Sequence, residues 1–286
     1  MILVGSSLRR GFQYPRGSFV RGGSSTDTIF TVPEGVFSIS AVAIGTGGRG
    51  GVTLDNTISA PGGGGGALAY SNNISVTPGE ILNVIIRRNL DEERESSQIV
   101  RASNDEILLL AENGGDFDGI FGGGRGRASQ SVGDVRHNGG EGGDGHQVNE
   151  TAAGAGGAGG YSGPGGDGAN SDDPTGTTTA TDGSGGAAGG GGLATNQAGG
   201  GGGGTGLFGE GASGVAGPNI TSTFDDSGGG GGSGGDDGGN SSGGEYGGGR
   251  GGRAPNQSQS TGLVGAWGGI RIIWGSPSRG FPNNAG

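Results

Sequence analysis

Glycine at every third position is the feature of this sequence that most constrains its fold. In residues 152–170, AAGAGGAGGYSGPGGDGAN, glycine recurs at positions 154, 157, 160, 163 and 166, and again at 156, 159, 165 and 168. The same Gly-Gly-X order returns in residues 139–147 and 248–253. Three residues per turn is the repeat of the polyproline II helix, which rises about 3.1 Å per residue. The spacing therefore predicts extended helices of the polyglycine-II type.

Whether such helices are stable depends on how many of them pack together. Ordering each backbone residue costs roughly 1–2 kcal/mol, and glycine loses the most freedom. One hydrogen bond returns about 1 kcal/mol net, so one or two helices would not be stable. Because glycine lets backbones approach closely, each helix can bond to several neighbours. We expect a bundle of many helices, nucleated by a conventional folded module.

Composition leaves two other interpretations open. With 81 glycines in 286 residues and only 28% hydrophobic residues, the chain resembles disordered or fibrous proteins. Linkers rich in glycine and serine are random coils, which is the default alternative. Collagen has one glycine per triplet and many prolines, whereas this chain often has two glycines per triplet and only ten prolines. The ordered Gly-Gly-X repeat favours the folded bundle.

The sequence on either side of the glycine-rich region is typical of β-strands. Pro33-Glu34-Gly35 and Pro78-Gly79 are turn signals, and residues 91–98 are predicted to form a charged loop. Residues 263–274 include both tryptophans and, as a lone strand, would need partners. We predict that this segment returns to the N-terminal module and closes it. The other predicted strands lie within 28–35, 36–45, 67–80 (two short ones), 81–88 and 106–112.

The predicted fold class is mainly β: a small N-terminal β module closed by a C-terminal strand, with an inserted glycine-rich polyglycine-II helical bundle and displayed loops. Glycine density changes near Asn113 and Thr261, which marks the boundaries of the insertion. The predicted divisions are an N-terminal docking segment (1–26), a β module (27–112 plus 262–275), the bundle with its loops (113–261) and a C-terminal tail (276–286).

Charge and hydropathy limit the possible partners. The formal net charge of −11 argues against nucleic acid, because phosphate binding needs a cationic surface. No apolar run is long enough to span a membrane, so no membrane insertion is expected. The opening residues MILV are too short for the hydrophobic core of a signal peptide. We expect synthesis in the cytoplasm without a signal peptide.

Three stretches resemble a known class of proteins. FTVPEGVFSISAVAIGTGGRGG, GGGGGALAYSNNISVTPGE and the ending GGIRIIWGSPSRGFPN resemble the glycine-rich domain of bacteriophage tail-fibre and virion structural proteins. The glycine-rich middle is similar to the small adhesins at the tips of T-even-type phage long tail fibres. This resemblance implies a virion protein with polyglycine-II helices, loops that bind a bacterial outer-surface receptor, and attachment to a tail-fibre or neighbouring virion protein.

Two sets of residues are candidates for contacts. Aromatic rings stack on sugars or fill pockets, and Asp and Thr exchange hydrogen bonds with hydroxyl groups. The candidate receptor-binding residues are Tyr161, Asp172, Asp173, Thr175, Phe208, Phe224 and Tyr246. Arginine and aromatic residues are enriched at interfaces, which indicates an attachment role for the N-terminal stretch. The candidate attachment residues are Arg9, Arg10, Phe12, Tyr14, Arg16 and Phe19.

No motif indicates catalysis or a cofactor. GxGxxG-like strings occur here without a surrounding βαβ unit, and no serine sits in a nucleophile elbow. His137 and His146, with Glu141 and Asp144 between them, are expected to be solvated loop residues rather than metal ligands. The pairs Asp172-Asp173, Asp225-Asp226 and Asp236-Asp237 lack EF-hand spacing and favour turns over calcium binding. We predict no enzyme activity, no metal and no cofactor.

Two alternatives to a receptor-binding adhesin remain open at this point. A structural virion or fibre subunit could self-assemble into a homo-oligomer through its strand edges and N-terminal stretch, without binding a receptor. An ice-binding bundle would need a flat row of Thr or Ala at the X positions, and the X positions here are mixed.

Overall fold

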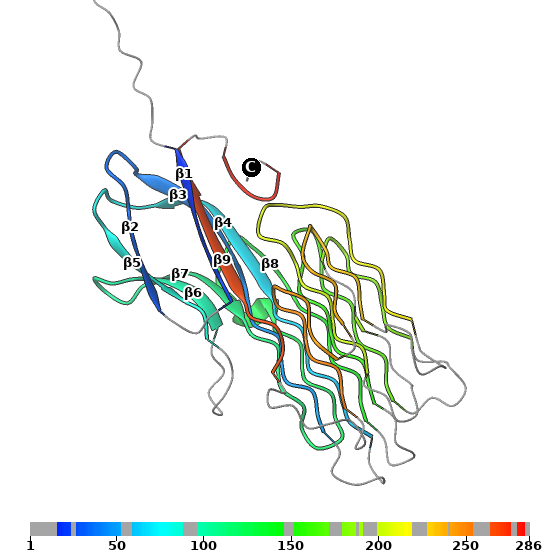
Figure 1. Ribbon diagram of the computed structural model, residues 1–286. Helices are drawn as coiled ribbons and strands as arrows, with labels where there is room; N and C mark the ends of the chain where they lie inside the picture. The colour runs from blue at the N-terminus through cyan, green and yellow to red at the C-terminus, as the bar shows by residue number, and fades with distance from the viewer. Residues whose placement is uncertain are drawn as a thin grey trace, which may run out of the picture.

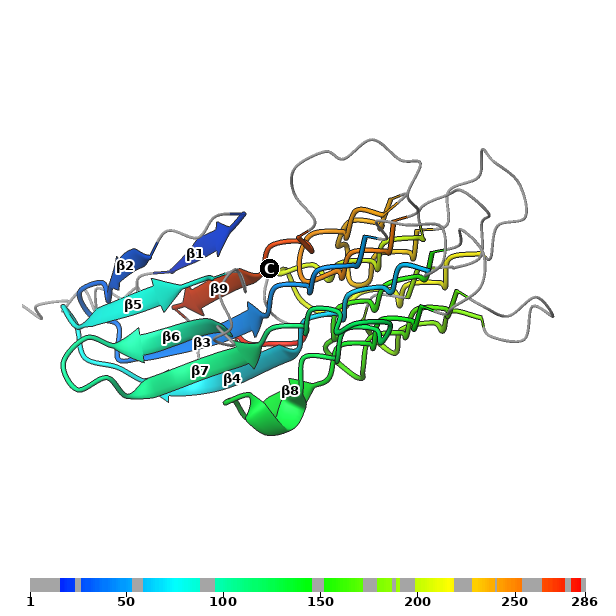
Figure 2. The same ribbon diagram turned by 90° about the horizontal axis from the view of Figure 1, so that it is seen from below.

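The computed structural model consists of a β-sandwich and a set of glycine-rich runs that extend side by side from one end of it (Figures 1 and 2). The residues that the structure describes are 16–23, 27–52, 59–87, 96–145, 152–171, 179–186, 189–190, 199–218, 228–239, 241–253, 264–275 and 279–283.

Two antiparallel sheets form the sandwich, as a mainly β fold predicts. The five-stranded sheet has the order β1-β9-β3-β4-β8, and the four-stranded sheet has the order β2-β5-β6-β7. Within the described residues the only helix is a short 3₁₀ turn, η1. The elements are β1 Gly17–Gly22, β2 Thr28–Thr31, β3 Ser38–Ile44, β4 Leu68–Ser75, β5 Ile81–Ile85, β6 Ser96–Arg101, β7 Ile107–Glu112, η1 Ala128–Gln130, β8 Val135–His137 and β9 Gly269–Trp274.

The C-terminal strand β9 lies inside the five-stranded sheet, between β1 and β3. Arg271 is opposite Val20 on one side and opposite Val42 on the other. The two predicted turns are present, because Gly35 and Gly79 both have positive φ, and Val36 N–H donates to Pro33 O at 3.1 Å. A positive φ is a conformation that glycine adopts without steric cost.

Several predicted boundaries were wrong. Residues 17–22 were assigned to a docking segment but form β1, which pairs with β9. Residues 96–98 were assigned to a charged loop but begin β6, and residues 67–80 contain one strand rather than two. His137 was expected in a solvated loop but lies in β8, opposite Leu68. These short strands hold few alternating hydrophobic residues, so their pairing depends on neighbours that are distant in sequence.

The main hydrophobic core lies between the two sheets. The five-stranded sheet contributes one face of β3, β4 and β9, and the four-stranded sheet contributes the alternate residues of all its strands. Phe30 lies between the rings of Phe19 and Trp274, with centroid separations of 5.5 Å and 5.4 Å. Other members of this core are Ile39, Ala41, Ala43, Leu82, Val84, Ile99, Leu109, Ala111, Ile270 and Ile272.

The opposite face of the five-stranded sheet is covered by residues from the glycine-rich region and from the C-terminal tail. Val42, Ile44, Leu68 and Ile273 on this face form a second apolar cluster. The covering residues, which come from distant parts of the chain, are Ala158, Tyr161, Leu207, Tyr246 and Phe281. The five-stranded sheet is therefore buried on both faces and connects the sandwich to the rest of the molecule.

The glycine-rich runs are direct continuations of the strands. β3 continues into residues 45–52, 59–67 lead into β4, and β7 continues into 113–118. Residues 138–145 follow β8, and 264–268 lead into β9 (Figure 2). The sandwich thereby fixes the spacing and direction of several runs before they leave it.

Run 152–160 shows how these segments are held together. Its backbone N–H groups donate to three other segments in rotation, so that every third residue faces the same neighbour. Ala153, Gly156 and Gly159, for example, all donate to the segment 60–66. Its carbonyl oxygens accept bonds from three further segments. The six neighbours are 60–66, 166–169 and 200–203 as acceptors, and 140–143, 190 and 249–252 as donors.

Candidate functional site

The runs reverse direction next to the sandwich, and these turns carry most of the predicted aromatic contacts (Figure 1). The turns at 161–163, 207–209 and 245–247 place Tyr161, Leu207 and Tyr246 against the five-stranded sheet. The sequence analysis predicted these residues in displayed loops and did not predict that they lie together at this end of the runs.

Tyr161 is buried, which contradicts its predicted role in receptor contact. Its side chain is 1% exposed and its ring stacks on Phe281 with a centroid separation of 6.0 Å. The hydroxyl donates to Gly206 O at 3.0 Å and accepts from Gly209 N–H at 3.3 Å. Burial raises the pKa of the Tyr161 hydroxyl far above its ordinary value. The residue holds the turn at 207–209 against the sheet.

Tyr246 has a related packing role. Its half-buried ring lies over Gly22 and Gly269, which are paired across β1 and β9. A Cβ atom at either glycine would overlap or crowd the ring, so glycine is needed for this close approach. Burial raises the pKa of Tyr246, with Glu245 and Asp236 adding to the effect.

Phe208 is the one candidate aromatic that the structure both describes and exposes, at 67%. The guanidinium carbon of Arg271 lies 4.4 Å from its ring centroid, and Arg271 Nη1 donates to Leu207 O at 3.4 Å. Arg271 is 3% exposed, and burial, with a smaller contribution from Arg279, lowers its pKa. A cation over an aromatic face stabilises the charge where water is excluded. Arg271 therefore fixes the turn that presents Phe208.

The attachment candidates divide into two groups. Phe19 is in β1 and contacts Phe30 in the main core, so its ring is part of the sandwich. Arg16 is exposed just before β1. Arg9, Arg10, Phe12 and Tyr14 lie outside the described residues.

The remaining receptor candidates, Asp172, Asp173, Thr175 and Phe224, also lie outside the described residues. The described residues that flank six internal gaps lie away from the sandwich, at the opposite end of the runs from the turns (Figure 1). At this end Val52 pairs with Arg253, and Ala60 pairs with Ala152, both in parallel.

Aspartate, asparagine and threonine on the surface of the runs accept backbone hydrogen bonds. Asp167 Oδ1 accepts from Glu141 N–H at 2.7 Å, and Asp167 N–H donates to Thr181 Oγ1 at 2.7 Å. Asp144 Oδ1 likewise accepts from Gly122 N–H, while Asp144 N–H donates to Asn170 Oδ1. At the surface a run has no adjacent run on its outer side. The side-chain oxygens accept the outward N–H groups in its place, because each N–H needs an acceptor.

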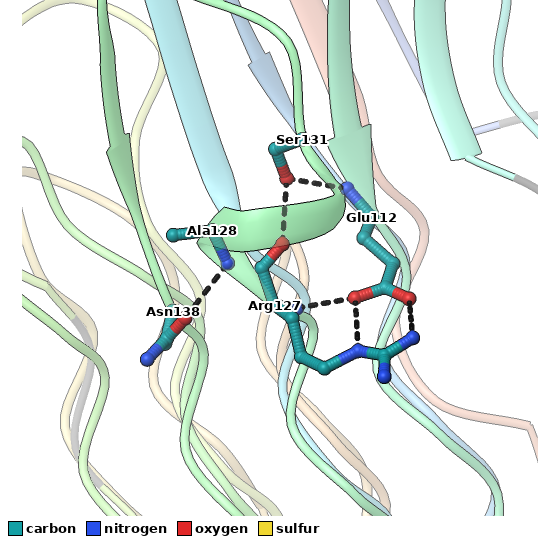
Figure 3. Close-up of polar contacts among 5 residues, drawn as sticks. All are labelled: Glu112, Arg127, Ala128, Ser131 and Asn138. Atoms are coloured by element: carbon teal, nitrogen blue, oxygen red, sulfur yellow. Dashed lines mark hydrogen bonds and ion pairs between the residues drawn. The ribbon is translucent and has the colours of Figure 1, made fainter.

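An ion pair between the buried carboxylate of Glu112 and the exposed side chain of Arg127 secures the junction between sandwich and runs (Figure 3). Glu112, 6% exposed at the end of β7, accepts from the backbone N–H and Nε of Arg127, and its other oxygen accepts from Nη2 at 2.8 Å. Ser131 Oγ accepts from Glu112 N–H and donates to Arg127 O. The Glu112 carboxylate raises the pKa of Arg127. Such bidentate pairs have a defined geometry, so this contact orients the chain between β7 and η1.

Among the described residues no three or more His, Asp or Glu side chains gather in a way that could hold a metal ion. Asp237 Oδ1, from one of the acidic pairs, accepts from Gly231 N–H at 2.7 Å. In the same described part of the chain, no helix has the length and hydropathy to cross a membrane.

Comparison with known proteins gives no family. No protein-family description matches the chain, and no curated protein matches it.

Proposed function

We propose that the glycine-rich runs form a bundle of polyglycine-II helices. The observation that supports this is the rotation of hydrogen bonds along run 152–160, where donors three residues apart reach the same neighbour. Three residues per turn gives that rotation. Run 59–67 supports it too, because its N–H groups donate in turn to 140–143, 247–250 and 112–115.

We further propose that the protein is a bacteriophage tail adhesin or tail-fibre subunit that binds a bacterial surface receptor, protein or glycan, and resides in the virion. The sequence resemblance supports this class of protein, and so does the arrangement of the sandwich and the runs. The sandwich and the turns of the runs form one packed end, and the described residues that flank six internal gaps lie at the other (Figure 1). A rigid support lowers the entropy cost of binding by loops.

The receptor contact is proposed through Asp172, Asp173, Thr175 and Phe224, which belong to two of the gaps whose described flanking residues lie away from the sandwich (Figure 1). Phe208 is a second candidate because it is exposed, but it lies at the sandwich end. The two locations make different predictions for mutation and can be separated.

Adsorption competition tests the proposal. Purified protein is incubated with candidate host cells, phage is then added, and the phage that stays free in solution is counted. We expect wild-type protein to block adsorption and the combined variant D172A/D173A/F224A to lose the block. Phe208→Ala tests the sandwich end, and Phe37→Ala, which removes an equally exposed ring on the sandwich, serves as the matched control. Folded wild-type protein that fails to block adsorption on a host of the phage would contradict receptor binding.

The second candidate is a structural virion subunit without receptor binding. One observation favours it: the outer side of the four-stranded sheet exposes isoleucines among uncharged polar residues. Filaments or closed oligomers of purified protein, seen by electron microscopy, together with no effect on adsorption, would favour this candidate.

A further inference from the structure

The outer side of the four-stranded sheet has an unusual composition. Strand register separates its residues from the core-facing set that includes Phe30, Leu82 and Leu109, and one of the outward residues, Val100, is itself only 7% exposed. In the pairing, Ile29 is opposite Asn83, and Gln98 is opposite Leu110. We call the outward set the outer face: Ile29, Thr31, Ile81, Asn83, Ile85, Gln98, Val100, Ile107 and Leu110.

Side chains on the outer face are aliphatic or uncharged, and several are in contact with solvent. Ile29 is 64% exposed, Ile81 46% and Ile107 42%. No described element lies over this side of the sheet in either view (Figures 1 and 2). A sheet face turned to water normally alternates with polar and charged residues, so an aliphatic one marks a surface that another molecule covers.

Ion pairs surround the outer face. Arg87 Nη2 is 3.0 Å from Asp27 Oδ2 at the end near the glycine runs, where Glu112 and Arg127 also pair. Arg101 pairs with Glu80 and Glu106 at the opposite end. Each charged rim group named here thus has an oppositely charged partner. An uncharged centre inside a polar, ion-paired rim is a common pattern of protein interfaces.

We propose that the outer face is a self-association surface that packs against the outer face of a second copy. The charge distribution favours this occupant. The chain carries a net charge of −11, so two copies repel unless they meet through uncharged surface. A two-fold contact places the outer face opposite itself, where no charged side chain has to be desolvated. Isoleucines from the two sheets would interdigitate as in a sandwich core.

The size of the outer face predicts a weak dimer. Four strands about 4.8 Å apart and roughly five residues long give a footprint on the order of 300 Å². Stable interfaces bury about 800 Å² of accessible surface per partner. We therefore expect association at high protein concentration, which closely spaced copies in an assembly would strengthen.

Sedimentation equilibrium over a wide concentration range tests the proposal. We expect reversible dimers in the wild type, at least tenfold weaker association for Ile81→Glu, and no change for the matched control Val215→Glu, which places the same charge at a 71% exposed valine of the glycine-rich region. A monomer at every concentration, or equal weakening by both variants, would overturn it. The proposed receptor contact does not involve this sheet, so the Ile81→Glu protein should still block adsorption. The failure of one proposal would therefore leave the other standing.

A crosslinking variant gives a second measurement. The chain has no cysteine, so Asn83→Cys introduces a single thiol near the centre of the outer face. Because that centre meets its own copy on the two-fold axis, mild oxidation should give a disulfide-linked dimer far faster than in Val215→Cys. Equal rates for the two variants would contradict the proposed contact.

Discussion

The sandwich and the glycine-rich runs satisfy the same backbone groups in different ways. In the sandwich, each strand bonds to neighbours in one plane, and alternate side chains fill a core between two sheets. In run 152–160, the backbone bonds to neighbours all around it and glycines replace the core. The sandwich depends on side-chain volume, whereas the runs depend on its absence. A substitution that adds one methyl group should therefore lower the free energy of unfolding more in the runs than in the sandwich.

The largest expected effect comes from adding a methyl group inside the runs. A Cβ at Gly65 would overlap the carbonyl group of Gly157, because these runs lie in direct backbone contact. We expect Gly65→Ala to lower the free energy of unfolding by about 3 kcal/mol or more, since packed backbones cannot move aside easily. Chemical denaturation followed by circular dichroism measures it.

Gly124→Ala is the matched control, because a Cβ there meets no atom within 4 Å. Its stability should equal or slightly exceed that of the wild type, since alanine restricts the unfolded chain. If Gly65→Ala were as stable as Gly124→Ala, the close packing of the runs would be wrong.

A smaller effect is expected at the contact between the two regions. Tyr161→Phe removes a buried hydroxyl and leaves Gly206 O and Gly209 N–H without it. We expect a loss of about 1–2 kcal/mol in the free energy of unfolding. Tyr246→Phe, at a half-buried ring, should change it by less. A reversed order would mean that the 207–209 turn does not rest on Tyr161.

Surface capping of the runs should contribute about 1 kcal/mol per site, as helix caps do. Asp167→Ala removes the oxygen that accepts from Glu141 N–H. Asp167→Asn keeps an oxygen in that place, so it should retain most of the stability in thermal unfolding. If the asparagine variant were as unstable as the alanine variant, charge rather than backbone capping would be responsible.

The smallest effect is the pH dependence from His137. Burial lowers its folded-state pKa, partly offset by a hydrogen bond to the Tyr161 backbone. The unfolded chain, with a pKa near 6.5, then takes up a proton first as the pH falls. The stabilisation is present above about pH 6.5 and declines below it. Denaturation between pH 8 and 5.5 should show a shallower decline for His137→Gln than for the wild type, and identical curves would contradict this.

The sequence allowed part of this structure to be predicted. Alternation in 36–45 and the Pro-Gly turns follow local rules, so that strand and those turns were found. β1 and β8 were missed because their short, mixed sequences are paired by distant segments. Tyr161 was predicted to be displayed because it is an isolated aromatic among glycines. Its burial depends on a chain reversal against a sheet that the local sequence does not encode.

The role of the acidic residues was also only partly predictable. Asp144 was expected to be a solvated loop residue, and no role was predicted for Asp167. Their position at the X place of the glycine triplets was a usable signal, because a glycine-rich run at the surface lacks one neighbour and its outward N–H groups need another acceptor.

Hydrogen exchange of the native protein tests the central claim most directly: that the glycine runs are as firmly bonded as the strands. Peptides from 152–160 and from β3, read by mass spectrometry, compare the two regions within one sample. We predict that the amides of 153–159 are protected to within about tenfold of those in β3, since both open only with the whole fold. Exchange of 152–160 at the rate of an unstructured chain, with β3 still protected, would contradict the account.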